Sequence, residues 1–216
     1  MGLNNQEGQQ NTIRHILIIT AWRSGSTLLG DLISRYPGTF YSFEPKLFSI
    51  EEKLKFARTA SVIQNEYFEF VSKVFKCELS SKNIILGEIE NKQNFHRLRK
   101  NFRMWNVCQS MPKTQNDVCL MPDFYSKNCP LFPIQLIKVA MLRVQTALKI
   151  LHDPVLGKTM KLVILFRDPR GMMNSRKNLS WCKTHPFCYE PKVFCRDMHN
   201  DVLAAYNAKK EFPGKC

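Results

Sequence analysis

The sequence predicts an α/β fold with a mostly parallel sheet. Two segments share one order, in which a short apolar run is followed by a loop of polar and small residues and then by the start of a helix. The apolar runs are 16–19 and 162–166. Runs of this length, rich in β-branched residues and Leu, suit strands that are buried on both faces of a parallel sheet. Strands that alternate with helices along the chain favour that architecture.

Each further element has its own signal. After the first loop, residues 28–33 place Leu and Ile on one helical face, and Pro37-Gly38 predicts the end of that helix. A short apolar segment before Glu44 is the expected second strand. The other expected elements are a helix over 53–75, a strand over 134–142, a crossover helix over 144–151 and a helix that begins at Met172.

Composition indicates one globular domain with an anionic partner. The chain has 216 residues, of which 44% are hydrophobic and 23% charged. We expect a polar tail over 1–13 and a single domain over 14–216. The 32 basic and 18 acidic residues give a formal charge of +14, and residues 138–216 hold 15 of the basic but only 6 of the acidic side chains. The anion site should therefore draw on the second half of the chain.

Eight cysteines and the apolar pattern bear on the cellular compartment. No apolar run approaches the roughly 18 residues that cross a bilayer, and the start of the chain lacks the features of a signal peptide. The even number of cysteines favours disulfides in an oxidising compartment, with the pairing left open. Zinc is the weaker alternative, because Cys182, Cys188 and Cys195 lie further apart than the usual ligand pair. Residues 101–133, rich in Cys and Pro, are expected to form an irregular, disulfide-stapled insertion.

The first loop has the parts of a phosphate cradle. Gly25 allows close backbone approach, Ser24, Ser26 and Thr27 carry hydroxyl groups, and Arg23 supplies charge beside a helix N-terminus. The loop is not a Walker A motif, which needs two glycines and a lysine. The alternative interpretation is an ordinary polar turn that ends in a Ser or Thr cap.

The second loop carries another set of anion-binding groups. Arg167 ends an expected strand, Pro169 fixes the turn, and Ser175 and Arg176 lie in the first turns of the next helix. Ligands of open α/β sheets bind at the carboxyl ends of strands, where both loops lie. A ligand with two separated phosphates would meet both. The alternative is a local Arg167–Asp168 ion pair with Ser175 on the helix surface.

Together the two loops resemble those of Golgi carbohydrate sulfotransferases, in particular 6-O-sulfotransferases that act on N-acetylglucosamine or galactose. The segment 22–29 is similar to their 5′-phosphosulfate loop, and 167–171 with Ser175-Arg176 to their 3′-phosphate motif. The resemblance implies a P-loop NTPase-like three-layer α/β/α fold, 3′-phosphoadenosine 5′-phosphosulfate as donor without a metal, and residence in the Golgi lumen. The donor-binding residues that it implies are Arg23, Ser24, Gly25, Ser26, Thr27, Leu28, Arg167, Ser175 and Arg176.

The chain departs from that family at both ends. It has no N-terminal membrane anchor, and it stops at Cys216, before the family's later acceptor and adenine contacts. We therefore expect a partial chain whose domain is incomplete at the C-terminus. We expect contact with a membrane only through an N-terminal anchor that this sequence lacks.

Catalysis needs a base for the acceptor hydroxyl and charge to stabilise the leaving group. Glu44 lies in a Phe-Glu-Pro segment that resembles a motif of carbohydrate sulfotransferases, and it follows Arg23 by 21 residues, as the base does in tyrosylprotein sulfotransferases. Glu44 is the expected base, and Arg23 would stabilise the leaving phosphate. The alternative for Glu44 is a surface residue before a proline. Lys138 either contacts the sulfuryl group or extends from a strand edge to water.

The predicted function is sulfuryl transfer to a carbohydrate hydroxyl, with a glycan as partner and no nucleic acid. The alternatives are tyrosylprotein sulfotransferase-like activity, a P-loop kinase of a small metabolite, and a basic module without enzymatic activity. Asn178-Leu179-Ser180 is an N-glycosylation sequon, which matters only if the chain enters the secretory pathway.

Overall fold

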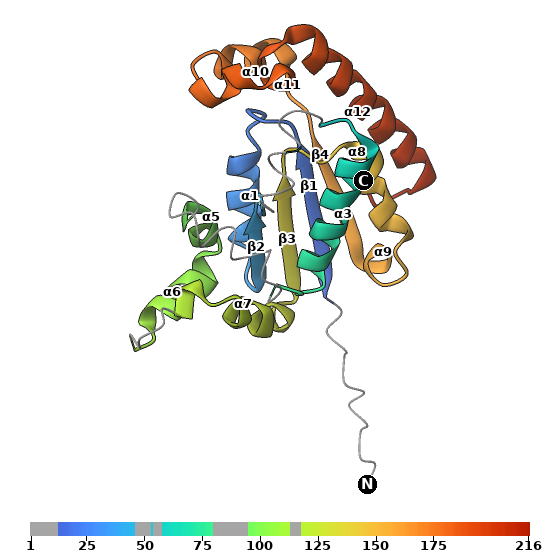
Figure 1. Ribbon diagram of the computed structural model, residues 1–216. Coiled ribbons are helices and arrows are strands. Elements are labelled where there is room, and N and C mark those ends of the chain that lie inside the picture. Colours follow the sequence, from blue (N-terminus) through green and yellow to red (C-terminus); the bar gives the residue numbers. More distant parts are fainter. Residues whose placement is uncertain (1–12, 46–52, 54–57, 80–94, 113–117) are drawn as a thin grey trace.

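A four-stranded parallel sheet forms the centre of the part of the chain that the computed structural model describes, residues 13–45, 53, 58–79, 95–112 and 118–216 (Figure 1). The strands lie in the order β2-β3-β1-β4, and each neighbouring pair is parallel. The predicted α/β fold with a mostly parallel sheet is confirmed. The bounds are Arg14–Thr20 for β1, Thr39–Phe43 for β2, Ile134–Val139 for β3 and Met160–Leu165 for β4.

Helices cover both faces of the sheet, which gives three layers (Figure 1). β1 has hydrogen-bonded neighbours on both sides, and its side chains alternate between two cores. Ile18 packs on the face covered by α1 (Ser26–Ser34), together with Tyr41 and Leu136. Leu17 and Ile19 join the larger core beneath α3 (Ser61–Phe75). The continuous apolar run over 16–19 is thus explained by a strand that is buried on both faces.

The remaining helices lie around this centre. The predicted crossover helix over 144–151 is a short helix followed by a 3-10 helix. The predicted helix over 53–75 is wrong at residues 58–60, which are not helical, and α3 begins at Ser61. The other bounds are α5 Phe95–Lys100, α6 Phe102–Ser110, α7 Pro122–Asn128, α8 Val144–Ala147, α9 Leu156–Thr159, α10 Pro169–Arg176, α11 Pro186–Tyr189, α12 Pro191–Glu211, η2 Val118–Leu120, η3 Cys129–Leu131, η4 Leu148–His152 and η5 Ser180–Thr184. In the described parts of the chain, no helix is both long and apolar enough to cross a membrane.

The expectation of an irregular insertion over 101–133 is wrong for its described residues. They form α6, η2, α7 and η3. Pro122 and Pro130 lie in the first turn of α7 and η3, where a proline costs no helical hydrogen bond. The side chain of Asn101 caps α6 by accepting a hydrogen bond from the Met104 amide. The prolines and the asparagine therefore start helices in this segment.

Three disulfides are present in the described residues, as the cysteine count predicted. They join Cys77 to Cys129, Cys108 to Cys119 and Cys182 to Cys188. Two of the three fasten the 101–133 segment, so the stapling expected there is confirmed. Cys195 and Cys216 are exposed thiols.

Candidate donor-binding and catalytic site

The loop from β1 to α1 leaves the first turn of a helix open to an anion. Arg23 and Gly25 both have left-handed backbone, with φ of 73° and 94°. Gly25 is the N-cap of α1, and no side chain caps this end. The interpretation as a turn that ends in a Ser or Thr cap is therefore wrong. The uncapped amides and the positive end of the helix dipole suit an anionic group.

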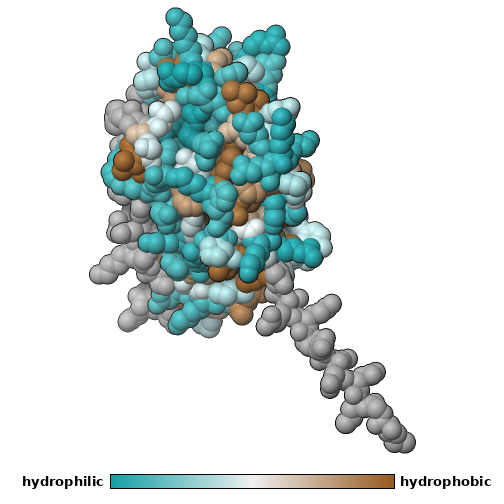
Figure 2. All heavy atoms as spheres, turned by 90° about the vertical axis from the view of Figure 1, so that its right-hand side faces the viewer, coloured by the Kyte–Doolittle hydropathy of each residue, from teal (hydrophilic) through white to brown (hydrophobic). Residues whose placement is uncertain are grey.

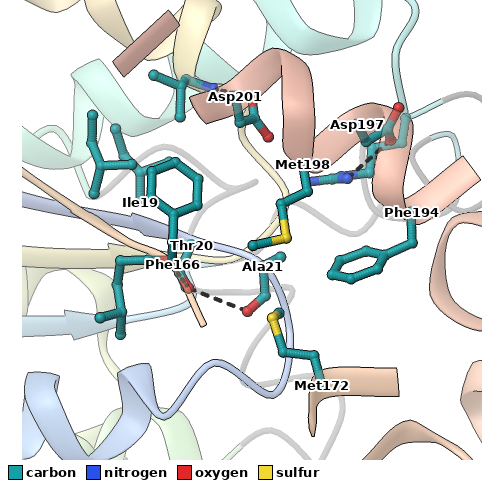
Figure 3. Close-up of a pocket in the computed structure, with 13 residues that line it drawn as sticks. Ile19, Thr20, Ala21, Phe166, Met172, Phe194, Asp197, Met198 and Asp201 are labelled. Carbon is teal, nitrogen blue, oxygen red and sulfur yellow. Dashed lines mark hydrogen bonds and ion pairs between the residues drawn. The ribbon is translucent and has the colours of Figure 1, made fainter. Parts of the chain in front are cut away.

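Neighbouring side chains brace this loop from within. The Thr20 and Ser24 hydroxyls hydrogen-bond to each other, and the Thr20 hydroxyl also donates to the Leu165 carbonyl at 3.1 Å. Ser24 is buried. A small hollow of about 20 Å³ lies behind the loop, where Met172, Phe194 and Met198 point toward Ala21 (Figure 3). The start of the loop is thus held between β4, α10 and α12.

The second loop is fastened to the first by direct hydrogen bonds. Arg167 donates from a terminal guanidinium nitrogen to the Arg23 carbonyl at 3.0 Å, and Arg23 Nε donates to Ser175 Oγ at 2.8 Å. These residues are 144 and 152 positions apart in sequence. Parallel strands β1 and β4 are neighbours, so their carboxyl ends bring the two loops together.

The local alternative required an ion pair between Asp168 and Arg167. In the structure, Asp168 pairs with Arg170 and not with Arg167. It caps α10 by accepting from the Arg170 amide at 2.9 Å, and it forms an ion pair with the Arg170 guanidinium at 2.6 Å. The side-chain hydrogen bond from Arg170 is the main cause that lowers the pKa of Asp168 to about 2. Arg167 is left to face the first loop.

Arg176 is buried, and its guanidinium binds backbone carbonyls. It donates to the Trp22 carbonyl at 2.8 and 3.2 Å and to the Cys188 carbonyl at 3.2 Å, and it stacks 4.1 Å from the Phe194 ring centroid. Burial, and then the charge of Arg58, lower the pKa of Arg176 to about 10. Arg176 therefore connects α10 to the first loop and to the loop closed by the Cys182–Cys188 disulfide.

A cavity of about 430 Å³ opens between these loops and the end of β2. Most of the predicted donor-binding residues line it, together with the predicted base. Ser24, Ser175 and Arg176 lie outside its wall. The lining residues are Trp22, Arg23, Gly25, Ser26, Thr27, Leu28, Glu44, Lys138, Arg167 and Trp181.

Glu44 lies at this cavity with its backbone and side chain both fixed. The backbone at Glu44 has a φ of 43°. The Glu44 amide donates to the Lys138 carbonyl at 2.8 Å, and Arg97 donates to the Glu44 carbonyl at 3.1 Å. The carboxylate forms an ion pair with Lys138, whose ammonium lies 4.7 Å from the Phe43 ring centroid. Lys138 is only 2% exposed. The alternatives of a surface glutamate and of a lysine that extends to water do not fit this geometry.

Comparison with known proteins finds similarity in one class. No family model matches the chain, and no solved structure matches it. It is 26% identical over 190 residues to carbohydrate sulfotransferase 7 of Rattus norvegicus. The aligned segment covers 76% of this chain and 38% of that protein. It is 25% identical over 175 residues to carbohydrate sulfotransferase 5 of Homo sapiens, which covers 76% and 42%. In sequence, the chain is similar to several proteins named carbohydrate sulfotransferases.

A third comparison has the same partial coverage. Carbohydrate sulfotransferase 2 of Homo sapiens is 27% identical over 181 residues, which is 74% of this chain and 33% of that protein. The chain thus spans less than half the length of these curated carbohydrate sulfotransferases.

Sequence reasoning did not single out two aromatic side chains at or near this site. Trp181 is 44% exposed, lines the cavity, and meets Trp22 edge to face at 4.7 Å between ring centroids. His96, which the sequence could not place, lies on α5 with its ring 6.4 Å from that of Phe43. For Trp181 the available signal was its place beside Cys182, since a short disulfide loop fixes its neighbours. His96 had no local signal.

Proposed function

We propose that this chain is the donor-binding part of a carbohydrate sulfotransferase, which transfers a sulfuryl group from 3′-phosphoadenosine 5′-phosphosulfate to a glycan hydroxyl. The acceptor position that we propose is the 6-O of N-acetylglucosamine or galactose. One observation carries the proposal: the uncapped start of α1, Arg167 and the Glu44–Lys138 pair all face a single cavity. The similarity to proteins named carbohydrate sulfotransferases supports the acceptor class.

The donor would be held at its two charged ends. Arg23 and the amides at the start of α1, from Gly25 to Leu28, would bind the 5′-phosphosulfate, and Ser26 and Thr27 would add hydroxyl groups. Arg167 and Ser175 would bind the 3′-phosphate. Direct contact of the donor with Ser24 or Arg176 stays a prediction, because both residues lie outside the cavity wall. Their contacts support a role in holding the loop.

The reaction would resemble phosphoryl transfer, in which positioning and charge stabilisation dominate. The acceptor oxygen bonds to sulfur while the bond from sulfur to the 5′-phosphate oxygen breaks. Glu44 would take the hydroxyl proton, and Arg23 would stabilise the negative charge left on the phosphate. Lys138, next to Glu44, would face the oxygens of the moving group. The products are a sulfate ester and adenosine 3′,5′-bisphosphate.

The Golgi lumen is the proposed site of action. Disulfides form and persist in the secretory pathway and are rare in the cytosol. The three disulfides of the described residues support a luminal protein.

Isothermal titration calorimetry with adenosine 3′,5′-bisphosphate and with ATP tests the donor site. We expect the bisphosphate to bind more tightly, and Arg23→Ala and Arg167→Ala each to weaken it roughly 10- to 100-fold, because each removes a charge-assisted contact. Arg170→Ala is the matched control. Arg170 is an exposed arginine at the start of α10, it pairs with Asp168, and it does not line the cavity. Equal affinity for ATP would point to the kinase instead. A loss in Arg170→Ala as large as in Arg167→Ala would mean that overall charge alone drives binding.

A further inference from the structure

The sequon Asn178-Leu179-Ser180 is the one Asn-X-Ser/Thr triplet in the 216 residues. Neither its middle residue nor the residue that follows it is proline, so the pattern is chemically competent. A triplet this short occurs often by chance. Its meaning depends on where the asparagine lies and on whether the chain enters the secretory pathway.

The structure places the asparagine on the surface of a well-anchored turn. Asn178 lies between α10 and η5, and both Asn178 and Ser180 are exposed. Leu179 packs against the main core, and its amide donates to the Arg176 carbonyl at 3.0 Å. Arg176 itself is 3% exposed. The backbone on either side is therefore held inward while the asparagine side chain faces solvent.

A disulfide begins two residues beyond the sequon. Cys182 pairs with Cys188, and two further disulfides join Cys77 to Cys129 and Cys108 to Cys119. Such pairs form in the oxidising lumen of the secretory pathway, which is also where asparagine-linked glycans are attached. The disulfides and the sequon thus point to the same compartment by independent chemistry.

We propose that Asn178 carries an asparagine-linked glycan. Asn178 Nδ2 loses a proton and bonds to the anomeric carbon of an oligosaccharide. The bond from that carbon to a phosphate oxygen of the lipid-linked diphosphate donor breaks, and the diphosphate leaves with the electron pair. The proposal rests on the luminal location given under the proposed function, and it does not depend on sulfuryl transfer.

The glycan would stand beside the donor cavity. Asn178 is three residues from Ser175, which accepts from Arg23, and three residues from Trp181, which lines the cavity. Since consecutive Cα atoms are 3.8 Å apart, the Cα of Asn178 is within about 11 Å of the Cα of Trp181. This modification therefore places a bulky, solvated chain near the half-exposed Trp181 ring.

The test uses this protein, expressed from its own gene in cultured animal cells and followed by immunoblot with and without peptide N-glycosidase F. Wild type should lose the mass of at least one glycan on treatment. Before treatment, Asn178→Gln and Ser180→Ala should each be smaller than wild type by the mass of one glycan. Ser180→Thr keeps the sequon and should shift like wild type, and Asn174→Gln, on the exposed side of α10, should also keep the shift.

A wild-type protein that does not shift overturns the proposal. A non-reducing gel of the same samples then separates the two inferences. If the cysteines are paired, the glycan is absent although the luminal location stands. If the thiols are free, the luminal location is rejected together with the glycan. If untreated Asn178→Gln and Ser180→Ala both run level with untreated wild type, the proposal is also overturned, because any glycan then lies elsewhere.

Discussion

At the scale of single residues, Glu44 shows how a strand end fixes one carboxylate. β2 ends at Phe43, and the Glu44 amide continues the pairing by donating to the Lys138 carbonyl of β3. The left-handed backbone at Glu44 then ends the extended conformation of β2. The carboxylate meets Lys138 from the neighbouring strand at the cavity. Backbone pairing and the ion pair therefore aim this side chain together.

If Glu44 is the base proposed above, its replacement by Gln should lower the turnover of sulfate transfer by roughly 100- to 10,000-fold, because the amide cannot accept the acceptor's proton. The dissociation constant for adenosine 3′,5′-bisphosphate should change little. Steady-state sulfate transfer and calorimetry measure the two quantities. Glu66→Gln is the matched control, since Glu66 also pairs with a lysine, Lys53, but lies on the surface. Retained turnover in Glu44→Gln would remove Glu44 from the mechanism.

The sequence predicted which residues line the cavity better than it predicted their hydrogen-bond partners. Gly25 and Arg23 could be found because a lone glycine after a strand and before a helix has few other uses. The hydrogen-bond partners of Arg176 could not be predicted, because they are the backbone carbonyls of Trp22, Phe187 and Cys188. A carbonyl is present at every position, so no residue pattern marks one as an acceptor. The pairing of Asp168 with Arg170 was also open, since Arg167 is even nearer to Asp168 in sequence.

At the scale of elements, α10 connects the second loop to the first. Its N-terminus is capped by Asp168, and its last residue, Arg176, binds the carbonyl at the start of the first loop. The same guanidinium binds carbonyls at the end of α11. A short helix can act in this way because both of its ends are fixed, one by a cap and one by a buried charge.

Replacement of Arg176 by Met should lower the free energy of unfolding by about 3 kcal/mol, because it leaves several buried carbonyls without a donor. It should also weaken binding of adenosine 3′,5′-bisphosphate, since the loop before Arg23 loses its support. Arg176→Lys should restore part of the stability, because one ammonium cannot reach all the carbonyls that the planar fork does. Urea unfolding and calorimetry provide the measurements. Lys177→Met, at the exposed neighbour, is the control, and an Arg176→Met protein with wild-type stability and affinity would contradict this role.

The segment over 101–133 shows why sequence patterns can mislead at this scale. Its short helices offer too few turns for a clear 3.6-residue period, and its prolines looked like loop signals. Two of those prolines instead begin helices. The strand β1 was predictable because both of its faces are buried, which favours the continuous apolar run over 16–19.

At the scale of the whole molecule, the chain combines a small sheet with a largely hydrophilic face on one side (Figure 2). The side of the molecule that includes α3, α9 and α12 is largely hydrophilic, with apolar groups scattered between (Figure 2). Val202, Leu203 and Tyr206 of α12 are among the exposed apolar residues. The helices over 102–131 lie at one end of the sheet, where disulfides hold them (Figure 1). Covalent links thus supplement packing at the periphery of the fold.

The disulfides should contribute to stability in the order of the loops that they close. The Cys77–Cys129 bond spans 52 residues and the Cys182–Cys188 bond spans 6. The loss of chain entropy in the unfolded state is worth about 4 kcal/mol for the longer loop and about 2 kcal/mol for the shorter. The double variant Cys77→Ala/Cys129→Ala should therefore lose more free energy of unfolding in urea than Cys182→Ala/Cys188→Ala. The exposed thiols give the control, since Cys195→Ala/Cys216→Ala should unfold like wild type. The reverse order would mean that Cys182–Cys188 acts mainly in the folded state, through the carbonyl that Cys188 offers to Arg176.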